Sequence, residues 1–109
     1  MLKRKTPDTL ATILTINGQG EQIKMAITYF NRTQDEIQNC LDTNNATEQA
    51  KSDMQYANRQ AVLFVVKEMA SEYELTDDGL KEMEADRPGM IEALFYGFHK
   101  ARRVELVKN

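Results

Sequence analysis

Two runs of apolar and β-branched residues in the first third of the chain predict a β-hairpin. The runs extend from Leu10 to Ile16 and from Ile23 to Phe30, and the turn-forming stretch NGQGEQ separates them. In the second run apolar and more polar residues alternate, which is typical of a strand with one buried face. We therefore expect a hairpin over about residues 9–30. Because two strands alone are only marginally stable in water, the hairpin should pack on helices or extend the sheet of another chain.

The hydrophobic positions also restrict how the two strands can pair. Pairing Ile16 with Ile23 keeps the apolar side chains of both strands on one face, whereas a slip of one residue would move half of them into solvent. The same register brings Leu14 opposite Met25. A tight turn at Asn17-Gly18 would preserve the same buried face. The pattern therefore predicts which face is buried and leaves the loop undecided.

Beyond the hairpin the apolar spacing changes to three and four residues, which predicts about four α-helices. Thr33 and Glu36 have the spacing of a capping box at the start of the first helix. Thr76, followed by two aspartates, is the expected N-cap of a later helix. The four expected helices cover about residues 33–44, 47–73, 77–86 and 89–104.

The longest expected helix, over residues 47–73, has more apolar surface than one stripe. Leu63, Val66 and Ala70 fall nearly opposite its main stripe, in line with Arg59. Something must cover these side chains. One interpretation is a central helix buried on two sides by the same chain, and the other is an interface with a subunit or a client protein.

The last expected helix combines bulky apolar residues with a basic end. His99, Lys100, Arg102 and Arg103 lie near its C-terminus, where cations interact favourably with the helix dipole. A basic patch that binds a partner is the alternative interpretation. The candidate residues for a partner or subunit interface are Arg59, Leu63, Val66, Ala70, Arg102 and Arg103.

These elements describe an α+β fold, with an N-terminal β-hairpin followed by about four α-helices and a predominantly helical chain. The 109 residues, 41% apolar and 28% charged, favour one domain spanning residues 1–109. The longest apolar run, Ala61–Val66, is far shorter than the roughly 18 residues of a membrane span. The basic stretch Met1–Thr6 continues into Pro7-Asp8, so we expect no signal peptide. A single cysteine, Cys40, fits a reducing cytosol.

The net charge of −3 hides a marked pattern along the chain. Residues 1–32 carry a net charge of +3, residues 33–86 of −9, and residues 87–109 of +3. A strongly acidic middle argues against binding to duplex DNA and favours a protein partner, or self-association of basic ends with acidic middles. An acidic, solvated set of helices with ordinary ends would give the same pattern.

The residues needed for common chemistries are missing. His99 is the only histidine, no paired cysteines or His-x-x-x-His spacing occur, and we expect no metal and no cofactor. Gly18-Gln19-Gly20 lies in the hairpin loop without the third glycine or the helix of a dinucleotide site. Cys40 could be a redox or nucleophilic thiol, but it lies on an apolar helix face, which favours packing. We expect that the protein is not an enzyme.

The C-terminal third resembles a known family. The segment LTDDGLKEMEADRPGMIEALFYGFHKARRVELVKN, residues 75–109, resembles the C-terminal half of tail assembly chaperones from long-tailed bacteriophages of the HK97 type. The shared features are a capped short helix, an aspartate and a Pro-Gly step before a final amphipathic helix, and a basic stretch ending in Lys-Asn. In this chain the matching positions are Asp86, Pro88, Gly89, Ala101–Arg103 and Lys108-Asn109.

The N-terminal part resembles the same family. There a hairpin leads into an aromatic, Arg-Thr and acidic helix start, matched here by Tyr29, Phe30, Arg32, Thr33, Asp35 and Glu36. The resemblance covers most of the chain, although residues 45–60 carry little that is distinctive. The chain departs from the family pattern in lacking a tryptophan and in having Arg87 where an aromatic residue often precedes the Pro-Gly step.

The resemblance implies an assembly factor of the host cell cytoplasm. Such a protein binds the tape measure protein, keeps it soluble and helps recruit tail tube subunits, and it is not retained in the virion. The family also self-associates, in rings or spirals, and often has a longer product made by ribosomal frameshifting. No nucleic acid and no membrane are expected as partners. Two alternatives are a small regulator that binds nucleic acid through Arg102, Arg103 and the basic N-terminus, and a structural tail component.

Overall fold

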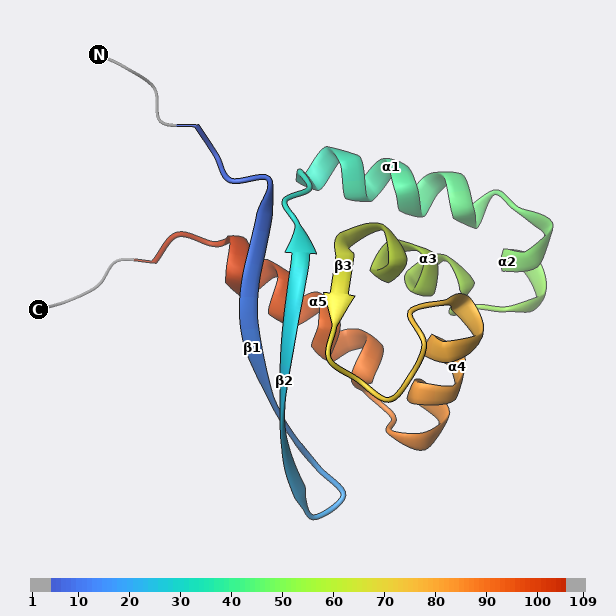
Figure 1. Cartoon of the computed structure of the whole chain (residues 1–109). Helices are drawn as coiled ribbons and strands as arrows, with labels where there is room; N and C mark the ends of the chain where they lie inside the picture. Colours follow the sequence, from blue (N-terminus) through green and yellow to red (C-terminus); the bar gives the residue numbers. More distant parts are fainter. Residues whose placement is uncertain (1–4, 106–109) are drawn as a thin grey trace, which may run out of the picture.

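The computed structural model describes residues 5–105, which form three strands and five helices (Figure 1). About half of this part of the chain is helical, and the expected α+β fold with an N-terminal hairpin is confirmed. The basic residues Lys3 and Arg4 and the final Lys108-Asn109 lie outside the described residues. In chain order the elements are β1 (Thr9–Gly18), β2 (Glu21–Phe30), α1 (Gln34–Asn45), α2 (Glu48–Ser52), α3 (Tyr56–Val65), β3 (Val66–Met69), α4 (Asp77–Asp86) and α5 (Met90–Arg102).

The hairpin has the predicted register. Ile16 lies opposite Ile23, and Leu14 lies opposite Met25. The two-residue loop is Gln19-Gly20 and not Asn17-Gly18. Both loop residues have positive φ, 52° and 79°, as a type I′ turn requires, and this turn matches the right-handed twist of the strands.

The expected helix over residues 47–73 is wrong, because the structure divides this segment into α2, α3 and β3. Asp53 ends α2 in an extended conformation, and its carboxylate accepts a hydrogen bond from the N–H of Gln55 (3.2 Å). At the other end, Val65 and Val66 are β-branched residues that suit a strand as well as a helix. The chain turns at Val66 into β3, which pairs antiparallel with β2 and gives the sheet order β1-β2-β3.

The other helices lie where the spacing predicts them. At α1, Thr33 Oγ1 accepts from the N–H of Glu36 (3.2 Å), and the carboxylate of Glu36 accepts from the N–H of Thr33 (2.8 Å), which confirms the capping box. Thr76 caps α4 as expected. The start of α5 has a cap that the sequence analysis missed, since Glu84 accepts from the N–H groups of Gly89 and Ile91.

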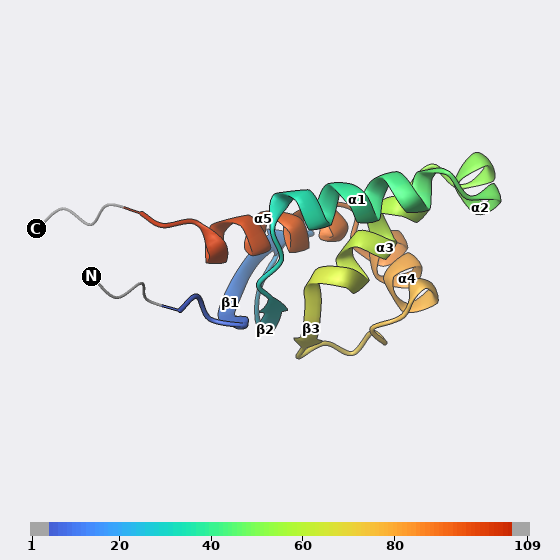
Figure 2. The same ribbon diagram turned by 90° about the horizontal axis from the view of Figure 1, so that it is seen from above.

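The described helices lie on one side of the sheet and enclose a single core with it (Figure 2). None of these helices is long and apolar enough to cross a membrane. Side chains from β2, α1, α3, β3, α4 and α5 meet in the core, which contains Met25, Ile27, Tyr29, Ile37, Val62, Val65, Val66, Leu80, Met83, Met90, Ile91, Leu94 and Phe98.

A close approach of α5 to the hairpin fixes the helix on the sheet. The buried hydroxyl of Tyr29 donates to the backbone carbonyl of Leu94 at 2.7 Å. Gly97 makes this possible, because a Cβ at that position would collide with Leu14 and lie 2.6 Å from the Tyr29 hydroxyl. The C-terminal end of α5 extends beyond β1 in both views (Figures 1 and 2).

Candidate protein-binding surfaces

The apolar helix face predicted from Leu63, Val66 and Ala70 does not form, because α3 ends at Val65. Val66 opens β3 and is 2% exposed, so it belongs to the core. Leu63 is half-buried and packs against the core. Ala70 follows β3 and is exposed, and its N–H donates to the carbonyl of Ala26 at 2.9 Å. Of the three residues, Ala70 alone stays open to a partner.

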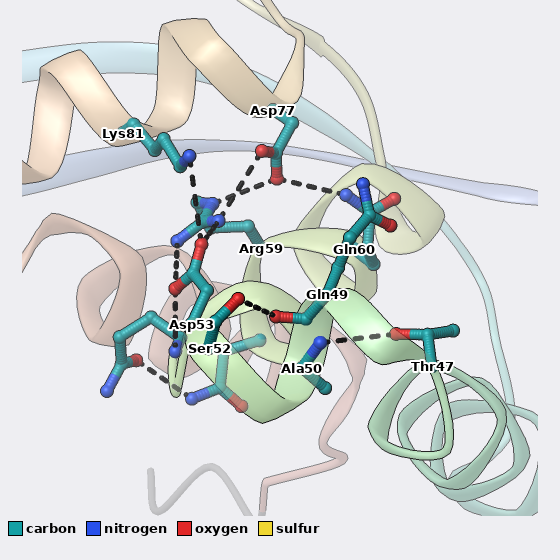
Figure 3. A network of polar contacts seen from close by, with 11 residues as sticks. Thr47, Gln49, Ala50, Ser52, Asp53, Arg59, Gln60, Asp77 and Lys81 are labelled. Atoms are coloured by element: carbon teal, nitrogen blue, oxygen red, sulfur yellow. Dashed lines mark hydrogen bonds and ion pairs between the residues drawn. The ribbon is translucent and has the colours of Figure 1, made fainter.

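Arg59 is also buried, at 4% exposure, so its assignment to an interface is wrong for this structure. Its guanidinium lies between α3, α4 and the segment before α3 (Figure 3). The Nε of Arg59 donates to Asp77 at 2.9 Å, and the guanidinium also pairs with Asp53. Gln60 donates to Asp77 at 3.0 Å, and Lys81 Nζ lies 3.7 Å from Asp53. Two carboxylates thus compensate one buried cation, which is a structural role.

The same network determines the charge of Asp53. The hydrogen bond from Arg59 is the main cause that lowers the pKa of Asp53 below its ordinary value of 3.8, and the N–H of Gln55 and the charge of Lys81 act in the same direction. The carboxylate therefore stays ionised at neutral pH. The network fastens α2, α3 and α4 together.

Arg102 and Arg103 are exposed at the end of α5 and remain candidate contact residues. Arg102 Nε donates to the side-chain oxygen of Asn31 at 2.8 Å. Arg103 pairs with Glu105 at 2.7 Å. Of the residues in this basic patch, Arg103 has its charge compensated locally by Glu105, which weakens its interpretation as part of a phosphate-binding surface.

The two residues considered for chemistry have no reactive surroundings in the described chain. Cys40 is half-buried on α1, and this burial raises the pKa of its thiol, although Asn44 hydrogen-bonds to the sulfur. His99 is exposed, and its ring meets the edge of Phe98 with centroids 5.4 Å apart. Within residues 5–105 no three His, Cys, Asp or Glu side chains are grouped to hold a metal ion.

The side of the sheet that faces away from the described helices is a second surface. Antiparallel partners share one face, so Ala11, Ile13, Ala26 and Thr28 lie together there, and Ala70 continues this face beyond β3. These five residues line a shallow hollow, and Ile13 is 66% exposed. We call this surface of Ala11, Ile13, Ala26, Thr28 and Ala70 the open face.

The outer edge of β1 adjoins a groove. β1 is an outermost strand of the sheet, and the groove runs between it and the overhanging part of α5. Tyr96, 63% exposed, lines this groove together with Leu14, Ile16, Ala93, Lys100 and Arg103. We call this the edge groove. Two of the four large hydrophobic side chains that are exposed in the described chain, Ile13 and Tyr96, therefore border β1.

Comparisons of the chain with protein family models, with curated proteins and with solved structures found no match.

The open face was not predicted from the sequence, although a signal for it exists. Ala11, Ile13 and Thr15 alternate with the inward Leu10, Leu14 and Ile16. Because alanine, isoleucine and threonine are compatible with either face of a strand, the alternation shows two uncharged faces and does not show which one helices cover.

Proposed function

We propose that this protein is a tail assembly chaperone of a long-tailed bacteriophage. It binds the tape measure protein in the host cell cytoplasm, keeps it soluble and helps to recruit tail tube subunits, and it leaves before the virion is complete. The resemblance of both halves of the chain to that family supports this proposal. The observation that carries it is the open face, five uncharged residues in a shallow hollow that Glu68 borders, on a sheet that the described helices cover on one side only.

The open face has the properties that an amphipathic helix of a client needs. Its side chains are short, so a helix can approach the sheet closely, and Ile13 supplies apolar contact area. A helix laid across it would complete a three-layer arrangement of helix, sheet and helix. Lys24 and Glu68 are exposed beside it on the same face and offer a polar rim.

Client binding needs no catalytic group. Holding an aggregation-prone helical protein in solution requires that its apolar stripe be covered, and no bond is made or broken. We therefore expect no enzymatic activity and no cofactor.

Co-expression with the tape measure protein of the same phage tests the proposal. We expect the tape measure protein to be soluble and to co-purify with this chain, and to precipitate without it. Ala26→Glu and Ala70→Glu, which place a carboxylate on the open face, should reduce its solubility and co-purification. Asn39→Glu adds the same charge to an exposed position of α1 and is the matched control.

Two outcomes would contradict this proposal. If the solubility of the tape measure protein does not depend on this chain, the chaperone function is wrong. If the chain helps but the two open-face variants help equally well, the client binds elsewhere. Mass spectrometry of purified virions separates an assembly factor from a structural tail component, since only the latter stays in the particle.

A nucleic-acid-binding regulator is the second candidate, and exposed Arg102 with Lys100 on the last turns of α5 is the observation that favours it. Such binding would be strongly salt-dependent. Retention on DNA at low salt, lost on Arg102→Ala, would support the regulator, and absence of retention would exclude it.

A further inference from the structure

We propose that two copies of this chain associate through β1. The two β1 strands pair antiparallel about a twofold axis at Ile13 and join the two sheets into one sheet of six strands. This inference concerns the edge of the sheet and not the open face, so it does not depend on the chaperone function.

The two edges of the sheet are built differently. β3, at one edge, has four residues, carries Lys67 and Glu68, and is interrupted by an irregularity in its pairing with β2. Short length, charge and irregularity are the usual means of preventing unwanted strand pairing. β1, at the other edge, extends over ten residues in unbroken register and has neither a charged residue nor a proline. An edge of this kind is expected to have a strand beside it.

The hydrogen bonds identify the backbone groups that β1 presents to its outer edge. The backbone carbonyl of Ala26 accepts a hydrogen bond from the N–H of Ala70, so the backbone N–H and C=O of Ala26 point toward β3. Its partner Ile13 must then direct its own N–H and C=O away from β2, because the backbone groups of such a pair point away from each other. Because this direction alternates along a strand, every second residue of β1 also points its N–H and C=O away from β2. The outward set, which we call the β1 edge, is Thr9, Ala11, Ile13, Thr15 and Asn17.

A second copy satisfies this edge completely. With the twofold axis at Ile13, Thr9 pairs with Asn17 of the other copy, Ala11 with Thr15, and Ile13 with Ile13. Each outward N–H and C=O of the β1 edge thereby finds a partner. The paired strands bring no like charges together, since β1 has no charged residue, and the central pair is β-branched, which is favourable across strands.

The edge groove provides the apolar contact that such pairing needs. On the helix-facing side of the sheet, Met25 and Ile27 of β2 are buried, whereas Leu14 and Ile16 of β1 are only half-buried. Exposed Tyr96, in the middle of α5, lines the edge groove, and the C-terminal end of α5 extends past β1 (Figures 1 and 2). The β1 strand of a second copy would lie over this overhang and cover those side chains.

Sedimentation velocity of the full chain tests the dimer. We expect the wild-type chain to sediment as a dimer at micromolar concentration. Ile13→Lys should weaken association at least about tenfold, because it places two ammonium groups opposite each other at the axis. Ala26→Lys is the matched control, since Ala26 lies opposite Ile13 on the same face but one strand away from the axis. A monomeric wild-type chain, or equal effects of the two lysines, would overturn the proposal.

Cysteine pairing tests the register with changes that disturb the fold less. In a Cys40→Ala background, Ile13→Cys should form a disulfide-linked dimer under mild oxidation, because the two residues face each other across the axis at a distance that a disulfide spans. Ala26→Cys should not. If Ile13→Cys fails to cross-link, or cross-links no faster than Ala26→Cys, the register about Ile13 is wrong.

Discussion

Gly97 is the residue on which the docking of α5 depends. A side chain here would push against Leu14 and the Tyr29 hydroxyl, whose hydrogen bond to Leu94 is buried. We predict that Gly97→Ala lowers the free energy of unfolding by about 2 kcal/mol, the usual cost of overfilling a packed contact, even though alanine favours a helix more than glycine does. Urea denaturation measures this.

Gly18→Ala is the control for that prediction. Nothing lies within 4 Å of a Cβ built at Gly18, which is exposed at the end of β1. This variant should be neutral or slightly stabilising. Equal stabilities of the two variants would show that α5 does not approach the hairpin as closely as the structure has it.

Asp53 gives the fold a defined response to acid. The pKa of Asp53 is lowered in the folded chain, mainly by the hydrogen bond from Arg59. The ionised carboxylate therefore stabilises the fold at every pH above 3.8, the ordinary pKa of an aspartate. This stabilisation is lost as the pH falls through the lower pKa that Asp53 has in the folded chain. We predict that Asp53→Asn is less stable than wild type at neutral pH and that this difference shrinks below pH 3.8. Urea denaturation across a pH series measures it. Glu82→Gln, an exposed change on α4, controls for charge, and a difference that is constant with pH would contradict the prediction.

At the level of the elements, α1 shows how far local sequence alone determines structure. Thr33 and Glu36 predicted a capping box, and both of its hydrogen bonds are present. We predict that Thr33→Ala costs about 1 kcal/mol of stability. Thermal or urea unfolding measures this, and Thr43→Ala, at an exposed position within α1, should be neutral or slightly stabilising. An equal loss in both variants would argue against the cap.

The α3–β3 segment shows where local sequence fails. The hairpin register, the caps at Thr33 and Thr76 and the helices near the predicted positions all follow from short-range patterns. The end of α3 depends on a distant element, since β2 has a free edge that only a strand can pair, and the valines at 65 and 66 tolerate either conformation. The burial of Arg59 escaped prediction for the same reason, because its partner Asp77 lies 18 residues away.

The molecule as a whole keeps charge away from one edge of its sheet. Apart from Glu68 in β3, the acidic residues of the middle of the chain lie on the helices or in the loops beside them, whereas the residues of the β1 edge and of the open face are uncharged. The basic-end, acidic-middle pattern suggested head-to-tail association through charge. The sheet offers a different mode, in which backbone hydrogen bonds and apolar contacts join two copies and close the assembly at a dimer.

Salt distinguishes the two modes of association. Charge-driven stacking should weaken markedly between about 0.05 and 0.5 M NaCl, because screening shortens the range of exposed charges to a few ångströms. Pairing along the β1 edge brings no charged strand residues together, so we predict that the dimer dissociation constant changes less than about threefold over this range. Sedimentation velocity at several salt concentrations measures it, with Ala26→Lys as a control of unchanged interface. A dimer that dissociates as salt rises would show that the basic and acidic segments, and not β1, hold the copies together.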